Sequence, residues 1–291
     1  MPLRAQAAPR EPKAANLEVY RKPEVVSHYA SLDYLTACER LLFDTYLAPG
    51  MAILDLGVGG GRTTRHLSQK ASRYAGVDYS EEMIRLCRDK FPQLEFVVAD
   101  ASDLSQFPDR SFDAVVFAFN GLDYVLPAEK RRRCLGECQR VLKAGGTLIF
   151  SSHNPRAIFL RPSWDPQTLR AFAQRLFPQP GAGFAVLRGA VAAAKWGYAV
   201  GRALAGSSLR IVRRVPTSAF RRGEGCLVDS AHGGLTTHYW TPRHAVAEAS
   251  NAGFRLERLV GDDYPRRSRE LVTDWYYYVL KKESSTGESC A

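Results

Sequence analysis

The sequence lacks the cysteine patterns that mark metal sites, disulfide frameworks and redox motifs. Among its 291 residues, no two cysteines form a CxxC pair and none has a histidine at zinc-ligand spacing. This distribution favours scattered reduced thiols in a cytoplasmic protein, and no metal site is expected. The six cysteines are Cys38, Cys87, Cys134, Cys138, Cys226 and Cys290.

Long hydrophobic runs are also missing. No uncharged apolar run reaches about 18 residues, so a membrane-spanning helix is not expected. The first residues are partly basic but contain no apolar segment of the kind found in secretory signals. Residues 1–16 and 283–291 are small and polar, and we expect both to be disordered tails.

Acidic residues are scarce in one long segment. Residues 155–230 hold twelve basic and three acidic residues, and therefore carry nearly all of the formal net charge of +10. Such an excess invites an acidic partner, which is a nucleic acid, an anionic membrane surface or an anionic small molecule. The segment also interrupts the pattern of the chain on either side of it, so we interpret it as an insertion.

Outside that segment, apolar runs alternate with stretches of helical periodicity. Fully apolar strands that alternate with helices are typical of a parallel sheet covered on both faces. We therefore predict an α/β, Rossmann-like, doubly wound and mostly parallel sheet of seven strands, with a core formed by residues 17–154 and 231–282. The predicted strands are 51–57, 74–78, 94–100, 112–119, 147–153, 255–261 and 274–282, and the predicted helices are 31–47, 61–71, 81–90, 128–142 and 242–254.

A glycine-rich loop follows the first predicted strand. In "AILDLGVGGGRTTRHL", Asp55, Gly57, Gly59 and Gly61 match the spacing D-x-G-x-G-x-G. Glycines allow a sharp turn and close approach to a ligand, and the next helix points its amides at an anionic group. A dinucleotide site prefers G-x-G-x-x-G, and here the last position is occupied by Arg62. A purely structural turn is the remaining alternative.

Aspartates end the next two predicted strands. Asp78 ends the second strand and Asp100 ends the third. A carboxylate at the first position can accept hydrogen bonds from both hydroxyls of a ribose, and one at the second can accept a bond from an exocyclic amine. Each aspartate alone could simply cap a helix. Together with the glycine loop at one edge of the sheet, they indicate a nucleoside site.

The combined pattern resembles class I S-adenosylmethionine-dependent methyltransferases. The matching stretches are "ILDLGVGGGR", "GVDYSEEMI", "VVADASDL", "FDAVVFAFNGLDYV" and "RVLKAGGTLIFSSHN". One departure is Val58, at a position where the family often has Cys or Ala. The resemblance implies that S-adenosyl-L-methionine (SAM) is the cofactor, and that its site is formed by Tyr29, Asp55, Gly57, Gly59, Gly61, Asp78, Tyr79, Met83, Asp100, Ala101, Phe119 and Asn120.

The same resemblance implies that the acceptor lies beyond the fourth and fifth strands. We expect methyl transfer to an O or N atom of a metabolite, sugar, quinone-like or lipid-like acceptor. His238 and His232 are the predicted general bases, with Tyr124 as a further catalytic candidate. The predicted substrate contacts are His153, Asn154, Asp229 and Tyr239.

The basic insertion, residues 155–230, is expected to be a lid over the acceptor pocket. Within residues 184–206, Arg188, Lys195 and Arg202 are seven residues apart and form one stripe of a predicted helix. The opposite face is small and apolar, and it could pack on the domain or lie on an anionic membrane. The alternative function is an RNA-modifying methyltransferase that binds phosphates through this insertion, although no RNA-binding module or adenine-methylating N-P-P-Y run is present.

Overall fold

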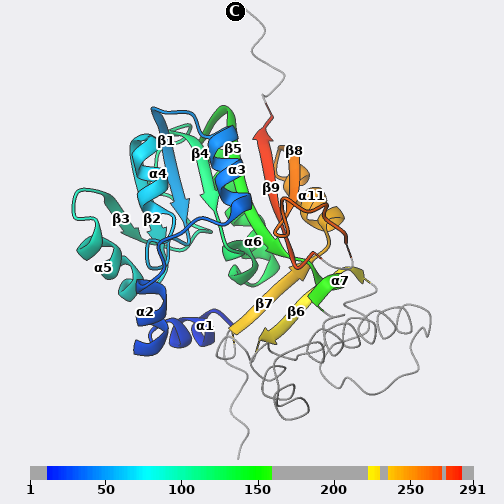
Figure 1. The fold of residues 1–291 in the computed structure, drawn as a ribbon, viewed down its shortest axis with the longest axis horizontal. Coiled ribbons are helices and arrows are strands. Elements are labelled where there is room, and N and C mark those ends of the chain that lie inside the picture. The colour runs from blue at the N-terminus through cyan, green and yellow to red at the C-terminus, as the bar shows by residue number, and fades with distance from the viewer. Residues whose placement is uncertain (1–11, 159–221, 230–234, 271–272, 284–291) are drawn as a thin grey trace, which may run out of the picture.

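The computed structural model describes residues 12–158, 222–229, 235–270 and 273–283. Their centre is a seven-stranded sheet of order β3-β2-β1-β4-β5-β9-β8 (Figure 1). This confirms the expected Rossmann-like α/β sheet, while the insertion between β5 and the last helix lies almost entirely outside the described residues. The strands are β1 (Met51–Leu56), β2 (Ala71–Asp78), β3 (Glu95–Val98), β4 (Phe112–Phe117), β5 (Leu142–His153), β8 (Phe254–Gly261) and β9 (Trp275–Lys282).

The directions of the strands indicate at which edge of the sheet a ligand is expected to bind. Strands β1 to β5 pair in parallel, whereas β9 is antiparallel to both β5 and β8. The strand order reverses at β1, which lies between β2 and β4. Ligands in open α/β sheets bind beyond the carboxyl ends of the strands at such a switch point. The carboxyl ends of β1, β2 and β4 therefore define where a site is expected.

Helices cover both faces of the sheet. Consecutive residues of a strand point to opposite faces, so each strand packs against both layers of helices. Ile53 packs in one cluster with α3 (Ala37–Tyr46), α4 (Thr64–Lys70) and α5 (Glu81–Lys90). Its neighbour Leu54 packs in the other cluster with α6 (Ala128–Val141) and α11 (Pro242–Asn251). Cys226 is exposed, whereas the other described cysteines are buried and serve as small core side chains: Cys38, Cys87, Cys134 and Cys138.

The N-terminal segment differs from the expected disordered tail. Residues 12–16 belong to helix α1 (Pro12–Tyr20), which is followed by α2 (Pro23–Ala30). Asn16 is buried and exchanges two hydrogen bonds with the backbone of Thr236, at 2.9 and 2.8 Å. This contact spans 220 residues, so the local composition of the tail could not reveal it.

A small second sheet accompanies the main one. Strand β6 (Glu224–Asp229) pairs antiparallel with β7 (Leu235–Trp240), and these two strands form no part of the seven-stranded sheet. Helices α1 and α2 and this pair lie beyond the carboxyl ends of β1 and β4 (Figure 1). The remaining short elements are α7 (Pro155–Ile158) and the 3₁₀ turn η1 (Gly121–Tyr124).

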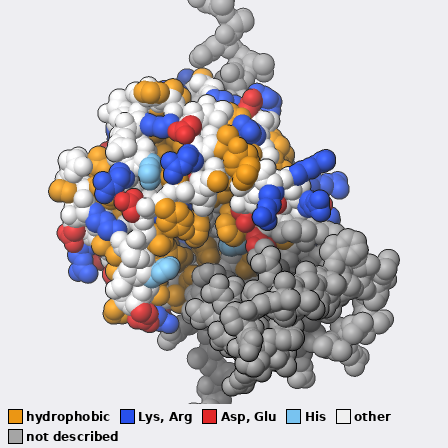
Figure 2. All heavy atoms as spheres, viewed as in Figure 1, with side chains coloured by type: hydrophobic (Ala, Val, Ile, Leu, Met, Phe, Trp, Pro, Cys, Tyr) orange, Lys and Arg blue, Asp and Glu red, His pale blue; other side chains and the backbone are white. Residues whose placement is uncertain are grey.

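The described surface shows no sign of a bilayer-crossing element. No helix of the described residues is long and apolar enough to span a membrane. The face in Figure 2 carries basic, acidic and hydrophobic side chains next to one another.

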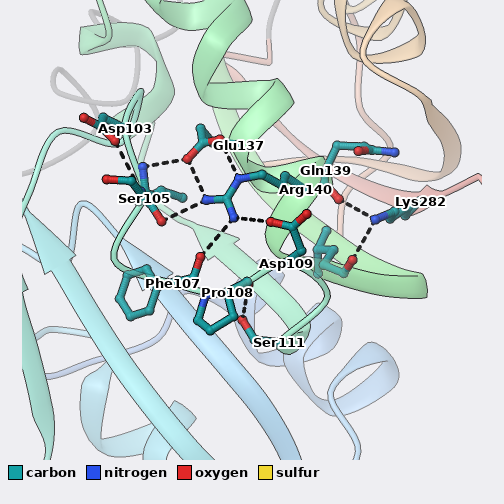
Figure 3. Close-up of polar contacts among 12 residues, drawn as sticks. Asp103, Ser105, Phe107, Pro108, Asp109, Ser111, Glu137, Gln139, Arg140 and Lys282 are labelled. Carbon is teal, nitrogen blue, oxygen red and sulfur yellow. Dashed lines mark hydrogen bonds and ion pairs between the residues drawn. The ribbon is translucent and has the colours of Figure 1, made fainter.

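A network around Arg140 fastens the loop after β3 to helix α6 (Figure 3). The guanidinium donates to both carboxylate oxygens of Glu137, to the carboxylate of Asp109, and to the carbonyls of Leu104 and Phe107. These bonds, led by those to Glu137, raise the pKa of Arg140. The network therefore holds a loop whose first residues, at the end of β3, face the candidate site.

Candidate active site

The glycine loop after β1 is pressed against the N-terminal helices. Gly59 has a φ of +52°, in the left-handed region that favours glycine. A Cβ on Gly60 would collide with the backbone carbonyl of Tyr29 at the end of α2. Only glycine permits this approach, which closes the loop from one side.

Arg62, at the end of this loop, is held by helix α3. Its guanidinium forms a bidentate pair with Glu39, with N–O distances of 2.7 and 2.6 Å. Glu39 also completes the cap of α3 by accepting the N–H of Thr36 at 2.8 Å. The guanidinium carbon lies 4.7 Å from the ring centre of Phe119. Arg62, which departs from the dinucleotide-binding pattern, is therefore buried and links the glycine loop to α3 and to the residues that follow β4.

Asp55 ends β1 inside the protein. Its Oδ2 accepts hydrogen bonds from the hydroxyls of Thr63 and Tyr74, both at 2.9 Å. Burial raises the pKa of Asp55 to about 6, although these two bonds oppose the shift. A cation placed beside this carboxylate would favour its ionised form.

Asp78 ends β2 and supports the glycine loop. Its Oδ2 accepts the N–H of Gly59 and its Oδ1 accepts the N–H of Ser80, both at 2.9 Å. Burial raises the pKa of Asp78, against the influence of these backbone donors. Each carboxylate oxygen can accept more than one bond, so this side chain can still receive hydroxyl donors from a ligand.

Asp100 follows β3 and is also oriented by local bonds. Its Oδ1 accepts from the N–H and the hydroxyl of Ser102, at 2.9 and 2.8 Å. Its Oδ2 lies 3.7 Å from the ammonium of Lys130 on α6. Three consecutive strand ends therefore present carboxylates at one edge of the sheet.

These strand ends surround a cavity of about 290 Å³. Of the twelve residues predicted to bind a cofactor, eleven line this cavity. Gly61 does not line it, but its neighbour Gly60 does. The lining residues are Tyr20, Tyr29, Leu32, Asp55, Gly57, Val58, Gly59, Gly60, Arg62, Thr63, Val77, Asp78, Tyr79, Met83, Ala99, Asp100, Ala101, Phe117, Ala118, Phe119, Asn120, Gly121, Tyr124, Val125, Leu126, Lys130, His153 and Trp275.

Four tyrosines form an aromatic wall of this cavity. The ring of Tyr20 packs edge-on against those of Tyr29, Tyr79 and Tyr124, with centroids 5.9, 5.9 and 6.4 Å apart. Burial raises the pKa of all four phenols, so they stay neutral donors at physiological pH. Tyr20 was missed because it lies on helix α1, beside the segment expected to be a tail.

The backbone is strained where β4 ends. Phe119 and Asn120 have φ values of +54° and +64°, which are uncommon for residues other than glycine. The hydroxyl of Ser151 on β5 accepts the N–H of Asn120 at 2.7 Å and holds this turn. Asn120 is buried, and its Oδ1 has no hydrogen-bond partner in the described part of the chain. Such strain and an unsatisfied acceptor are typical of ligand sites.

A carboxylate–imidazole pair lies at the same end of the cavity. Asp123 of η1 is fully buried and accepts Nδ1–H and the backbone N–H of His153, both at 2.8 Å. It also accepts a short hydrogen bond from the hydroxyl of Ser152. The Nε2 atom of His153 lies 3.1 Å from the amide nitrogen of Asn120. The sequence prediction included His153 but missed Asp123, which has no recognisable local pattern.

His238, a predicted general base, is not among the residues that line this cavity. Its ring lies 5.0 Å from that of Trp240, which in turn lies beneath the guanidinium of Arg131 on α6. Burial lowers the pKa of His238 to about 3, and Arg131 adds to this effect. A neutral imidazole of such low basicity, packed away from the cavity, does not support the expected role.

The other predicted acceptor residues divide between the cavity and its surroundings. Tyr124 and His153 line the cavity, and the ring of Tyr239 lies 5.2 Å from that of His153. Asn154 instead donates from its amide to the carbonyls of Glu270 and Thr273, at 2.6 and 2.8 Å. It therefore fastens the loop before β9. His232 and the side chain of Asp229 lie outside the described residues.

A comparison with protein families places this fold and cavity in a known group. Residues 53–146, which span β1 to the start of β5, match the family model described as a methyltransferase domain. Residues 53–146 therefore form a methyltransferase domain, and the chain is similar to SAM-dependent methyltransferases. SAM is the cofactor that such a domain implies.

Curated relatives match this chain over part of their length. A demethylmenaquinone methyltransferase from Thermotoga maritima is 40% identical over 100 residues, which are 34% of this chain and 42% of that protein. A fatty-acid O-methyltransferase from Mycolicibacterium smegmatis is 33% identical over 144 residues, or 48% of this chain and 50% of that protein. The chain spans about half the length of the curated relatives it matches.

Solved structures share the fold of this chain. A SAM-dependent methyltransferase from Methanosarcina mazei has a TM-score of 0.53 and 21% identity, with 87% of this chain and 99% of that chain covered. A 1,6-didemethyltoxoflavin-N1-methyltransferase from Burkholderia thailandensis has a TM-score of 0.55 and 12% identity, with 96% and 94% covered. At these identities the likeness concerns the fold alone.

Proposed function

We propose that this protein transfers the methyl group of SAM to a small-molecule acceptor. The observation that carries the proposal is the convergence of Asp55, Asp78 and Asp100 with the glycine loop around one cavity. Carboxylates in these places suit a molecule that carries an ammonium group, a ribose and an adenine amine.

The residues of the cavity fit SAM in chemistry and spacing. Asp78 would accept the ribose hydroxyls, since its two oxygens are buried and already oriented by backbone donors. Tyr79 and Met83 would flank the adenine, and Asp100 with Ala101 would bind its edge. Asp55 and the glycine loop would hold the methionine moiety, whose ammonium group would stabilise the ionised form of this buried carboxylate.

The proposed reaction makes modest chemical demands on the protein. Bound SAM supplies a methyl group that is already activated by the sulfonium charge. The chain's residues have to align the acceptor with that methyl group and exclude water, and orientation alone can contribute roughly 7–11 kcal/mol. The tyrosine wall and the close packing of α2 on the glycine loop serve both purposes.

A small apolar acceptor agrees best with the cavity. The aromatic side chains at its acceptor end suit an apolar metabolite. The names of two relatives, a demethylmenaquinone methyltransferase and a fatty-acid O-methyltransferase, support the expected quinone-like and lipid-like acceptors. The name of a third, a ubiquinone/menaquinone biosynthesis C-methyltransferase, adds a carbon atom as a methylation site.

The RNA alternative depends on the basic insertion. Most of the insertion, like the predicted membrane-binding stretch 184–206, lies outside the described residues. RNA binding driven by that charge would weaken steeply with salt, whereas binding of a neutral metabolite would not. We therefore propose both a lid role and a surface-binding role for residues 155–230. The salt dependence of binding distinguishes the two.

Calorimetry with SAM and with its demethylated product, S-adenosylhomocysteine, tests the proposed function. We expect both compounds to bind with a stoichiometry of one per chain. NAD serves as the control ligand, because the loop departs from the dinucleotide fingerprint at Arg62. Binding of NAD, or no binding of either adenosyl compound, would contradict the proposal.

A further inference from the structure

The acceptor end of the cavity contains an acid–base arrangement that the family resemblance did not identify. Asp123, His153 and Asn120 form a hydrogen-bonded chain that runs from the protein interior to the cavity. His153 and Asn120 line the cavity, whereas Asp123 lies behind them with no exposed surface. The order of the three groups determines which atom of the imidazole can react.

The carboxylate selects one tautomer of His153. An ionised carboxylate can only accept hydrogen bonds, so the Nδ1 atom that lies 2.8 Å from Asp123 must carry a hydrogen. In the neutral imidazole Nε2 then has a free electron pair, which accepts the amide hydrogen of Asn120 at 3.1 Å. A basic nitrogen therefore faces the cavity, and a buried carboxylate stabilises the positive charge that it would acquire.

We infer that His153 is the base that removes a proton from the methyl acceptor, and that the acceptor is a planar aromatic compound with an ionisable hydroxyl group. Asp123 acts through His153 as a positioning residue. This inference rests on the proposed methyl transfer and adds to it the class of acceptor.

The need for a base follows from the nucleophile. A neutral amine already carries the electron pair that attacks a methyl group, whereas a hydroxyl becomes a strong nucleophile only when it loses its proton. A phenolate shares its negative charge between oxygen and the adjacent ring carbons. The same base therefore serves methylation at oxygen and at carbon.

The transfer balances with the groups named. The hydroxyl proton of the acceptor moves to Nε2 of His153, and the acceptor's oxygen or ring carbon forms a bond to the methyl carbon. The bond from that carbon to sulfur breaks, and sulfur keeps the electron pair as a neutral thioether. After reaction at carbon, the ring loses the hydrogen from that carbon and recovers its hydroxyl. The imidazolium finally releases its proton to water.

Asn120 suits the oxygen of such an acceptor. Its Oδ1 is buried and unpartnered within the described residues, and its amide nitrogen lies next to Nε2. A hydroxyl that enters can donate to Nε2 of His153. Once the hydroxyl is ionised, the Asn120 amide can donate to the resulting oxyanion instead of to the imidazole.

The walls and charges around His153 favour an uncharged aromatic ring. Phe119 and Trp275 pack edge-on with centroids 6.1 Å apart, and Trp275 lies 6.4 Å from the imidazole. The two cations that line the described cavity already face carboxylates, since Arg62 pairs with Glu39 and Lys130 lies near Asp100. A carboxylate substrate would therefore find no unengaged cation among the described lining residues.

The test uses the full chain saturated with S-adenosylhomocysteine and the probe 4-nitrophenol, whose phenolate absorbs visible light. Among the described residues, the titratable groups in contact with the imidazole are Asp123 and Tyr239 of β7; its other neighbours there, Trp275 of β9 and Asn120, carry no charge. We expect the bound probe to ionise at a pH lower by at least about one unit than in buffer, because proton transfer to His153 creates an ion pair.

Three variants separate the roles. His153→Gln should abolish the shift, and Asp123→Asn should reduce it. His66→Gln, on helix α4 outside the cavity, should retain the shift in full. Since Asp123→Asn could disturb folding, nitrogen NMR of histidine-labelled wild-type protein provides an independent measurement, and we expect hydrogen on Nδ1 of His153.

Each outcome bears on one proposal. No shift in the wild type, a full shift in His153→Gln, or hydrogen on Nε2 in the free protein would overturn the role of His153. Failure of both 4-nitrophenol and 4-nitrocatechol to bind would overturn the acceptor class. Failure of S-adenosylhomocysteine to bind in calorimetry would instead remove the proposed function, and is detected before the probe is added.

Discussion

The Nδ1 atom of His153 lies 2.8 Å from Oδ2 of Asp123, although thirty residues separate them in the chain. Their contact joins the end of β5 to the 3₁₀ turn that follows β4. The strained residues Phe119 and Asn120 redirect the chain between β4 and this turn. The cavity therefore has one end built on strands β1 to β3, where we propose that the adenosyl group binds, and a second end that depends on how β4 and β5 terminate, where we propose that the acceptor binds.

Asp78→Asn is expected to weaken SAM binding about 5–150-fold. The reason is the loss of hydrogen bonds to the ribose hydroxyls, worth about 1–3 kcal/mol. Calorimetry measures the dissociation constants. Asp113→Asn is the matched control, because Asp113 also accepts a backbone N–H, that of Ala52 at 2.8 Å, but near the start of β4. Equal losses in both variants would show that the effect is structural and would remove the ribose assignment.

Gly60→Ala should destabilise the protein by about 1–3 kcal/mol and weaken SAM binding. The added Cβ would push the backbone of Tyr29, and with it the end of α2, away from the glycine loop. Urea unfolding and calorimetry report the two effects. At Gly136, on an exposed face of α6, a Cβ meets nothing within 4 Å. Gly136→Ala should therefore stabilise the helix by about 0.5–1 kcal/mol. If Gly60→Ala behaved like Gly136→Ala, the loop would not need the close approach.

Local spacing was enough to predict which residues line the end of the cavity beside β1 to β3. Asp55, Asp78 and Asp100 each follow an apolar strand, and parallel strands bring their carboxyl ends together without any detail of packing. The glycine loop is likewise a contiguous pattern. The seven strands were identified for the same reason, since their apolar runs are bounded by turns and alternate with helices.

The acceptor end depends on contacts that no local pattern contains. Asp123 pairs with His153 only because β4 leaves the sheet through two left-handed residues. The predicted base His238 illustrates the problem of strand register. Consecutive residues of β7 face opposite sides, so Tyr239 points towards His153 while His238 packs with Trp240. A sequence motif does not show which face of the strand each residue is on. It can therefore assign a catalytic role to the wrong one of two adjacent residues.

Asp55→Asn should change stability in a pH-dependent way. Burial raises the pKa of Asp55 from its ordinary value of 3.8 to about 6 in the folded chain, so folding favours its protonated form. Its contribution is complete below about pH 4 and is lost as the pH rises through about 6. Relative to the wild type, Asp55→Asn should gain about 2 kcal/mol between about pH 4.5 and about pH 7.5.

Urea unfolding at the two pH values measures this change. Asp44→Asn is the control, because Asp44 is exposed and its hydrogen bond to Lys70 lowers its pKa, so it stays ionised across this window. Its stability relative to the wild type should stay constant. A constant difference for Asp55→Asn as well would mean that Asp55 is ionised throughout and that its burial is compensated.

Arg140→Met is expected to lower the free energy of unfolding by about 1–2 kcal/mol, since partly exposed charged hydrogen bonds to the loop after β3 are lost. Its side chain is 28% exposed and engages Glu137, Asp109 and two backbone carbonyls (Figure 3). Arg132→Met is the control on the same helix, because that side chain is 56% exposed and pairs only with Glu129 among the described residues. It should change stability by less than about 0.5 kcal/mol. Hydrogen exchange should also show faster exchange of the Leu104 amide, which donates to Glu137 at 2.7 Å. Unchanged exchange there would mean that the loop keeps its position without the guanidinium, and that the carboxylate of Glu137 alone holds it.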